Sequence, residues 1–312
     1  MIENAAALWG KAGQLSLARL ALIEAVAQLT RALAQIASLP GTSALRREQI
    51  KLQVGLANAL MHAKGYAMPE TKAALDQARS LIERSEALGE PPEDPLLLFS
   101  VLYGFWAANQ TAFDGDVVRE LAAQFLALAE KQGATVPLVM GHRLMGSALV
   151  HIGNIDEGRA HYDQAIALYN PAEHRPLAIR FGHDFGVVIL FYRSWALWFL
   201  GYPEAALTDV GKALQNAQDI GHAATFMVAL VFTSLTHICC GNYTAAEAAL
   251  DQVLTLTEEK GASFWQAWAV MARDCVFALT GEASKAWKCS PPGPLHGDQR
   301  EQQFGCRFSP RI

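Results

Sequence analysis

The feature that most constrains this chain is a glycine that recurs with small residues at fixed distances behind it. After Gly201, small residues stand at Ala206 and Ala213, and after Gly241 the first stands at Ala246. Seven such glycines recur, 38 to 52 residues apart: Gly13, Gly65, Gly115, Gly153, Gly201, Gly241 and Gly281. A period of this length is typical of an array of helical hairpins rather than of a compact enzyme domain.

The repeated small residues have a steric reason. In the copy that starts at Gly153, Gly158 stands five positions later and Ala165 about two helical turns beyond that. The first small residue lets the second helix of a hairpin lie close to the first, and the second one lets the next hairpin pack against it. Larger side chains would push the helices apart, because protein interiors are close-packed. We therefore expect an all-α solenoid of six to seven hairpins.

Glycines and prolines divide the chain into segments with the length of single helices. The expected helices cover residues 16–37, 43–63, 69–88, 94–113, 116–131, 136–151, 155–169, 177–200, 203–220, 223–240, 243–260 and 263–280. Residues 1–287 then form one repeat domain.

The two ends of this expected domain look cut, because neither carries the polar capping helix with which solenoids normally end. Residues 288–312 lose the helical period and are rich in proline and glycine. We expect this tail to be disordered and to result from a disrupted reading frame or an artificial stop. The uncapped ends also offer surfaces for self-association.

Composition excludes several classes of partner. The net charge is −5, and 25 lysines and arginines provide no basic field for a nucleic acid backbone. The five cysteines are odd in number and scattered, which fits a reducing, cytoplasmic setting. The N-terminus lacks the basic start and apolar run of a signal peptide.

One segment, residues 223–246, has no Lys, Arg, Asp or Glu and is long enough to span a membrane. It also contains several polar residues and lies between turn glycines at the repeat period. We interpret it as a helix in the middle of the array, which is covered on two sides and therefore apolar nearly all round.

Three turn phrases resemble tetratricopeptide (TPR) repeats with lengthened helices. They are Leu200-Gly-Tyr-Pro-Glu-Ala-Ala-Leu207, Cys240-Gly-Asn-Tyr-Thr-Ala-Ala246 and Ile152-Gly-Asn-Ile-Asp-Glu-Gly158. The resemblance implies a right-handed superhelix that binds a protein or peptide in its concave groove.

Three other phrases resemble the C-terminal repeat region of bacterial proteins in which a class III adenylate/guanylate cyclase domain precedes an ATPase module. They lie at residues 45–54, 90–99 and 170–176, and the likeness covers about residues 5–287. The likeness assigns no catalytic residue to this chain, because the cyclase and ATPase parts would lie upstream of Met1. A phosphate loop ending in Gly-Lys-Ser/Thr is also missing from the sequence.

Cations and aromatic residues gather on the first helices of two neighbouring hairpins, where a concave face would bring them together. The candidate groove-binding residues are His142, Arg143, Arg180, His183, Arg193 and Trp195. They would hold an acidic peptide or an anionic ligand. The alternative is that the aromatic rings pack between helices while the arginines cap carbonyl groups or reach solvent.

Residues that could support catalysis or metal binding do not form a complete set. His237, Cys239 and Cys240 lack the second ligand pair that tetrahedral zinc requires. No serine stands in a Gly-x-Ser-x-Gly elbow. We expect no enzyme activity, no metal and no cofactor.

The sequence thus predicts a non-catalytic scaffold that binds a protein or peptide and relays the binding to attached modules, as in the sensor region of a nucleotide-cyclase signalling protein. Two alternatives stay open. One is a non-functional remnant of a disrupted cyclase gene, and the other is a ligand-sensing repeat domain of a transcription regulator.

Overall fold

The computed structural model describes residues 2–90 and 94–282, and this part of the chain is helical throughout, with short turns between the helices. The expected tail at residues 288–312 lies outside the described residues. The first eight helices are α1 (Ile2–Ala18), α2 (Leu22–Ala37), α3 (Ser43–Ala63), α4 (Pro69–Ala87), α5 (Leu96–Thr111), α6 (Gly115–Gln132), α7 (Thr135–His151) and α8 (Ile155–Leu168). The others are the short α9 (Pro171–His174), the 3-10 helix η1 (Arg175–Leu177) and α10 (Ala178–Phe181), followed by α11 (Phe185–Phe199), α12 (Pro203–Ile220), α13 (Ala223–Cys239), α14 (Tyr243–Lys260) and α15 (Ser263–Leu279).

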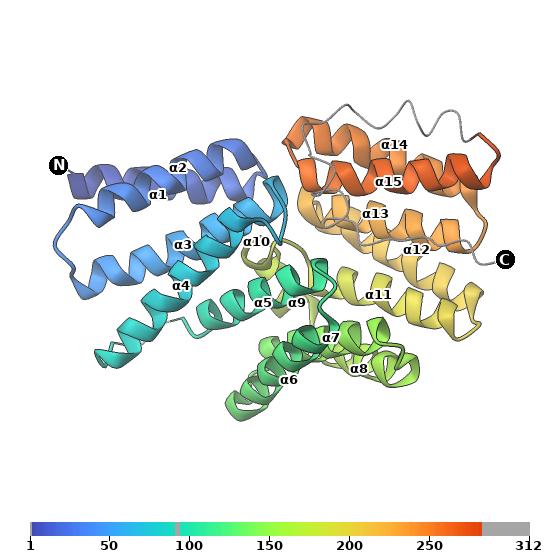
Figure 1. Cartoon of the computed structure of the whole chain (residues 1–312), viewed down its shortest axis with the longest axis horizontal. Helices are drawn as coiled ribbons and strands as arrows, with labels where there is room; N and C mark the ends of the chain where they lie inside the picture. The colour runs from blue at the N-terminus through green and yellow to red at the C-terminus, as the bar shows by residue number, and fades with distance from the viewer. Residues whose placement is uncertain (1, 91–93, 283–312) are drawn as a thin grey trace.

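The long helices form antiparallel hairpins that stack side by side. The pairs are α1 with α2, α3 with α4, α5 with α6, α7 with α8, α11 with α12, and α13 with α14, and α15 packs on the last pair. The array curves, so that the blocks that contain α1–α4 and α11–α15 lie side by side, with α5 to α8 at the bottom of the view (Figure 1). The expected all-α hairpin array is therefore confirmed.

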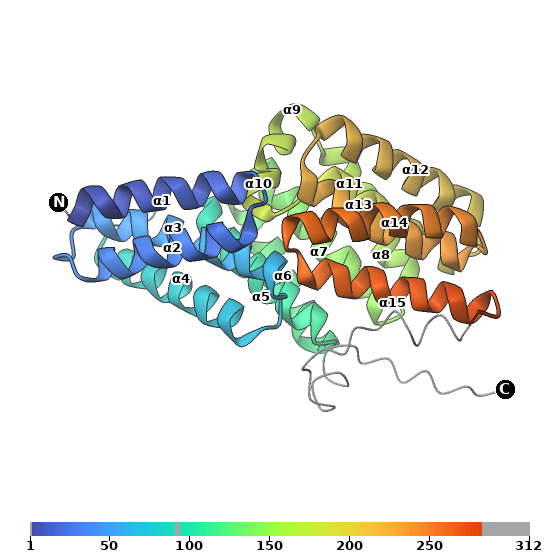
Figure 2. The same ribbon diagram turned by 90° about the horizontal axis from the view of Figure 1, so that it is seen from above.

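The first helices of the hairpins form a closed ring. Each of α3, α5, α7, α11, α13 and α15 contacts the next, and α15 in turn contacts α3. Seen from above, the N-terminal block lies against the C-terminal helices (Figure 2). The indole Nε1 of Trp265 donates a hydrogen bond to Nδ1 of His62 across this closure, at 3.0 Å. The superhelix thus completes a turn and meets itself.

The ring explains why its helices are apolar on nearly every side. Helix α13 lies between α11, α12, α14 and α15, and most of its side chains are buried. It forms most of the charge-free segment 223–246, which agrees with the interpretation of that segment as an inner repeat helix. Among the described residues, no helix combines the length and the hydropathy that crossing a membrane requires.

The repeated small residues lie where two helices approach most closely. A Cβ atom at Gly158 of α8 would stand 2.9 Å from the carbonyl oxygen of Gly146 in α7 and 3.1 Å from the backbone nitrogen of Val150. Four of the repeated alanines are fully buried: Ala165, Ala206, Ala213 and Ala246. The helices are therefore in backbone contact, and there is no room for a larger side chain at Gly158.

Two of the seven glycines are not turn residues, and this part of the prediction is wrong. Gly13 lies inside α1, which continues to Ala18 and turns at Leu20 with a φ of 57°. Gly115 begins α6, and the left-handed residue of that turn is Phe113, with a φ of 60°. Because a left-handed φ is uncommon for a residue other than glycine, the sequence gives little sign of these two turns.

The single helix expected over residues 177–200 is also wrong. The chain instead forms α9, η1 and α10, reverses at Gly182 with a φ of 80°, and begins α11 at Phe185. Asp184 caps this helix, since its Oδ1 accepts a hydrogen bond from the backbone nitrogen of Val187 at 3.0 Å. The break places His183 on a turn that faces the centre of the ring.

Candidate functional site

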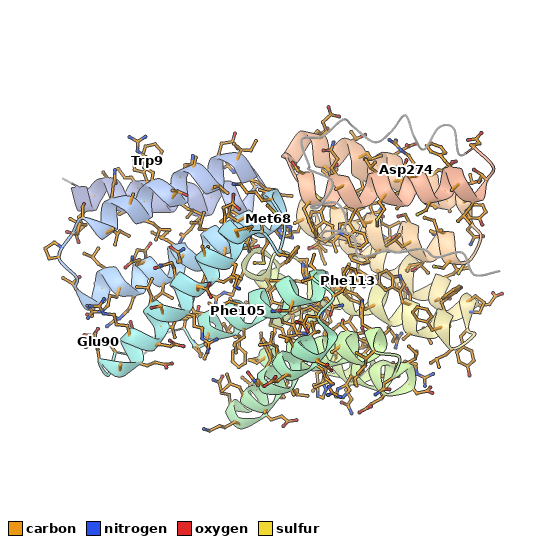
Figure 3. The ribbon with its side chains drawn as sticks, viewed as in Figure 1. Trp9, Met68, Glu90, Phe105, Phe113 and Asp274 are labelled. Atoms are coloured by element: carbon orange, nitrogen blue, oxygen red, sulfur yellow. The ribbon has the colours of Figure 1, made fainter. Side chains whose placement is uncertain are left out.

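A cavity of about 100 Å³ lies at the centre of the ring of inner helices. Helices α5, α7, α11, α13 and α15 all contribute side chains to its wall, together with the turn after α3. Phe113, labelled in Figure 3, contributes from the α5–α6 turn, close to where side chains of several helices converge. One pocket is therefore built by segments from most of the described chain.

Aromatic rings make up much of the cavity wall. Phe191 of α11 and Phe232 of α13 stack in parallel, with ring centroids 4.2 Å apart. The ring centroids of Tyr192 and Trp195 are 5.6 Å apart, and those of Trp195 and Phe232 are 5.2 Å apart. The ring centroid of Trp265 of α15 lies 6.2 Å from that of Phe232, so the wall extends from α13 to α15. A wall of this kind favours ligands with apolar or aromatic groups.

Among the residues that the structure describes, Arg143 of α7 is the only arginine or lysine in the cavity wall. Its side chain is 3% exposed, and its guanidinium lies 5.6 Å from the ring of Tyr103, 4.9 Å from that of Trp106 and 5.2 Å from that of Tyr192. Such cation–π contacts stabilise a buried cation in part. Nε and Nη1 of Arg143 make no hydrogen bond, and among the described residues no salt bridge reaches the group.

The other titratable groups of the wall are neutral at physiological pH. Burial, with the Arg143 charge as the next cause, holds the pKa of His183 well below its usual range. Burial also lowers the pKa of His151. Burial raises the pKa values of Tyr103 and Tyr192, and the nearby guanidinium opposes that rise. The cavity therefore holds a single positive charge.

His183 is buried and belongs to this wall. Its Nε2 lies 3.3 Å from the hydroxyl of Tyr103, and its Nδ1 has no hydrogen-bond partner. Arg143, His183 and Trp195 are thus the three predicted site residues that the fold brings together around one cavity.

The other three predicted residues lie elsewhere. Arg193 donates hydrogen bonds to both carboxylate oxygens of Asp209, at 2.7 and 2.9 Å, and a third to Asp163 at 2.8 Å. Arg180 forms an ion pair with Asp94. Both guanidinium groups therefore hold helices together instead of facing the cavity.

His142 lies on the side of α7 that packs against α8. Its Nδ1 is 2.9 Å from Nδ1 of His161, a distance at which one ring donates a hydrogen bond to the other. Burial lowers the pKa of both rings, and for His142 the proximity of His161 lowers it further. This pair is separate from the cavity.

The sequence prediction did not include several residues of the wall. Tyr103 and Trp106 come from α5, Phe232 from α13, and Trp265 and Trp268 from α15. A signal was present, because each lies on the first helix of a hairpin, as Trp195 does. What the sequence did not reveal is that six first helices close into one ring.

Residues that could ligate a metal do not cluster in the described part of the chain, where no group of three or more His, Cys, Asp or Glu side chains is close enough to share an ion. Cys239 is a free, exposed thiol, and Cys240 is free and partly buried. The described residues of the cavity wall include no carboxylate and no cysteine. The cavity is therefore suited to binding a ligand through the Arg143 cation and the aromatic rings of the wall.

Comparison with known proteins places the fold. No family model and no curated protein matches the chain. A Rap protein in complex with competence and sporulation factor is similar, with 15% identity and a TM-score of 0.58 over 91% of this chain and 74% of the Rap chain. RapI in its apo form has 12% identity and a TM-score of 0.56 over 88% of this chain and 99% of its own.

A signal transduction ATPase with a tetratricopeptide repeat sensor, from Pyrococcus horikoshii, has 14% identity and a TM-score of 0.46. It covers 88% of this chain and 42% of its own. At these identities the likeness shows the fold and nothing further. The chain is an all-α solenoid of TPR type. The glycine and alanine spacing predicts the hairpins, and the resemblance of the turn phrases implies the TPR type.

Proposed function

We propose that this chain is a non-catalytic regulatory domain that binds a short peptide, or a peptide segment of a partner protein, in the cavity at the centre of its ring. The observation that carries the proposal is the cavity wall itself. Side chains from five inner helices converge there, and they are mostly aromatic, with one buried cation and without a nucleophile and base arranged for catalysis.

Ligand binding at this place would act on the whole array. The wall includes α5 and α7 on one side and α13 and α15 on the other, so a ligand bridges helices that lie far apart in the sequence. A ligand that fits only one arrangement of these helices shifts the molecule toward it. The likeness to a Rap protein that binds competence and sporulation factor supports a regulatory role of this kind.

The wider context is also part of the proposal. The phrases at residues 45–54 and 170–176 resemble the repeat region of cyclase–ATPase proteins. In such a setting the ligand-bound array would control an attached signalling module. This step depends on the sequence resemblance alone.

Selection from a displayed library of random heptapeptides, followed by calorimetric titration of the selected peptides, tests the proposal. Ala107 of α5 lines the cavity and is 5% exposed, so Ala107→Leu places three further carbon atoms into the site. We expect selected peptides to bind the wild-type chain and to bind this variant about tenfold or more weakly, as expected when a pocket loses space for a few methyl groups.

The matched control is Ala123→Leu on the exposed face of α6, which makes the same chemical change away from the cavity. It should leave peptide affinity unchanged. Thermal unfolding of both variants checks that each is folded. Peptides that bind Ala107→Leu as tightly as wild type would place the site elsewhere, and a library that yields no binder would contradict the proposal.

A further inference from the structure

The unpaired polar atoms of the cavity wall are almost all hydrogen-bond donors. Nε and Nη1 of Arg143 and the indole Nε1 atoms of Trp106 and Trp195 are buried and have no partner. Arginine and tryptophan side chains only donate hydrogen bonds. Buried polar groups are normally paired in folded proteins, so a concentration of unpaired donors at one cavity calls for an explanation. An acceptor supplied by a ligand would provide it.

The charge at the cavity is also unmatched. Arg143 is a permanent cation, and within residues 2–90 and 94–282 the wall contributes no Asp or Glu to balance it. Two other predicted arginines are paired: Arg193 of α11 binds two carboxylates, and Arg180 binds one. Among the described residues Arg143 is the only arginine that is almost fully buried, and it lies where a ligand has room.

We propose that the cavity recognises a single carboxylate joined to an apolar or aromatic group, with Arg143 binding the carboxylate and the surrounding rings binding the apolar part. This inference rests on the proposed function, because it names the chemistry of the ligand that the cavity takes. The C-terminal residue of a peptide has this chemistry, and so does a small free aromatic acid.

The balance of charge favours a carboxylate over a phosphate. The imidazoles of His151 and His183 are neutral, as their buried positions dictate, so the wall provides one positive charge. One carboxylate neutralises it and can accept a charge-assisted hydrogen bond from an unpaired nitrogen of the guanidinium. A phosphate dianion would bring a second negative charge into a largely apolar wall that has no cation to meet it.

The volume of the cavity limits the size of the apolar part of the ligand. The cavity has a volume of about 100 Å³ and is bounded by the rings of Phe191, Phe232 and Trp265. It is too small for a folded partner and suited to one or two side chains. The terminal residue of a chain is the part of a peptide that combines a carboxylate with a single side chain.

Tryptophan fluorescence provides a direct assay, because Trp106, Trp195, Trp265 and Trp268 all line the cavity. The probes are N-acetyl-L-phenylalanine, its C-terminal amide, and 3-phenylpropionate. We expect both acids to change the emission saturably. The amide should bind roughly 10- to 100-fold more weakly, the range expected for a lost hydrogen bond to a charged group.

Variants of Arg143 and of a control arginine distinguish the effect of losing the Arg143 charge from the effect of losing the fold. Arg143→Met keeps an apolar side chain of similar length and should abolish the preference for acid over amide. Arg119→Met on the exposed face of α6 makes the same change outside the cavity and should bind like wild type. Thermal unfolding reports whether Arg143→Met is folded, and Arg143→Lys provides a second variant, which should keep a weakened preference for the acid.

The outcomes are distinct from those of the peptide selection. Equal binding of acid and amide by the wild-type chain would overturn the carboxylate proposal, as would a preference that survives in Arg143→Met. An acid that gives no signal up to its solubility limit would overturn it too. Selected peptides that lose affinity in Ala107→Leu would still support the proposed function in each of these cases. Tighter binding of N-acetyl-L-phenylalanine than of 3-phenylpropionate favours a peptide terminus, and the reverse favours a free acid.

Discussion

Replacing Gly158 by alanine tests whether the hairpins depend on backbone contact between their helices. A matched control exists at Gly211 in α12, which is exposed and where a Cβ atom would meet no atom within 4 Å. Both glycines are helical, so each replacement gains helix propensity worth about 1 kcal/mol. Any difference between the two variants therefore reports packing.

At Gly158 the added methyl group would stand 2.9 Å from the backbone oxygen of Gly146 and 2.7 Å from a methyl carbon of Val150. The backbone oxygen cannot rotate away, so α7 and α8 must separate by a few tenths of an ångström. Forcing an extra carbon into a packed interior costs about 1–3 kcal/mol. After subtraction of the propensity gain, we expect Gly158→Ala to lower the free energy of unfolding by up to about 2 kcal/mol.

Gly211→Ala should instead raise the free energy of unfolding by about 0.4–1 kcal/mol. Urea unfolding followed by circular dichroism at 222 nm, fitted with a common slope, measures both changes. Opposite signs are the expected result. If Gly158→Ala stabilised the chain as much as Gly211→Ala does, the close approach of α7 and α8 would not limit the side chain at this position. The steric explanation for the recurring small residues would then be wrong.

Two other perturbations follow from the described contacts. Burial lowers the pKa of His62 to about 4, and His222 is a smaller cause. Between pH 6.5 and 4 the unfolded chain therefore binds more protons than the folded one, and the stability that this group provides is full above about pH 6.5. On account of His62 the free energy of unfolding should fall by about 2 kcal/mol between pH 7 and pH 5. Urea unfolding at both pH values should show a smaller loss in His62→Gln, and an equal loss would contradict the assignment. Asp209→Asn should destabilise the fold by about 3 kcal/mol, because it leaves Arg193 partly buried beside a neutral partner that is only 4% exposed. Asp163 is 46% exposed, so Asp163→Asn should cost less than about 1 kcal/mol. Equal effects of the two replacements in urea unfolding would refute this ranking.

The sequence predicts the hairpins well because the information for them is local. Gly153, Gly201 and Gly241 are left-handed turn residues, and each is followed by a second helix with a small buried residue where the first helix approaches. Leu20 and Phe113 could not be predicted as turn residues, because a residue other than glycine rarely adopts a left-handed φ.

The site is harder to predict than the hairpins. Arg143 and Arg193 are similar in the sequence, since each lies on the first helix of a hairpin and neither helix contains an Asp or Glu. What separates them is whether a carboxylate lies opposite, and Asp209 meets Arg193 only because of the way α12 packs on α11. The cavity itself depends on the pitch of the superhelix, which the period of the pattern does not determine.

The meeting of α3 and α15 has a consequence for how this protein unfolds. In an open repeat array each unit touches only its neighbours, so stability is nearly a sum of local terms and end units unravel first. Here the bond between Trp265 and His62 joins positions 203 residues apart in the sequence. Loosening α15 therefore also removes a partner of α3, so fraying at one end weakens a hairpin near the other. We expect the chain to melt as one cooperative unit, and hydrogen exchange should give α3 and α15 similar protection factors.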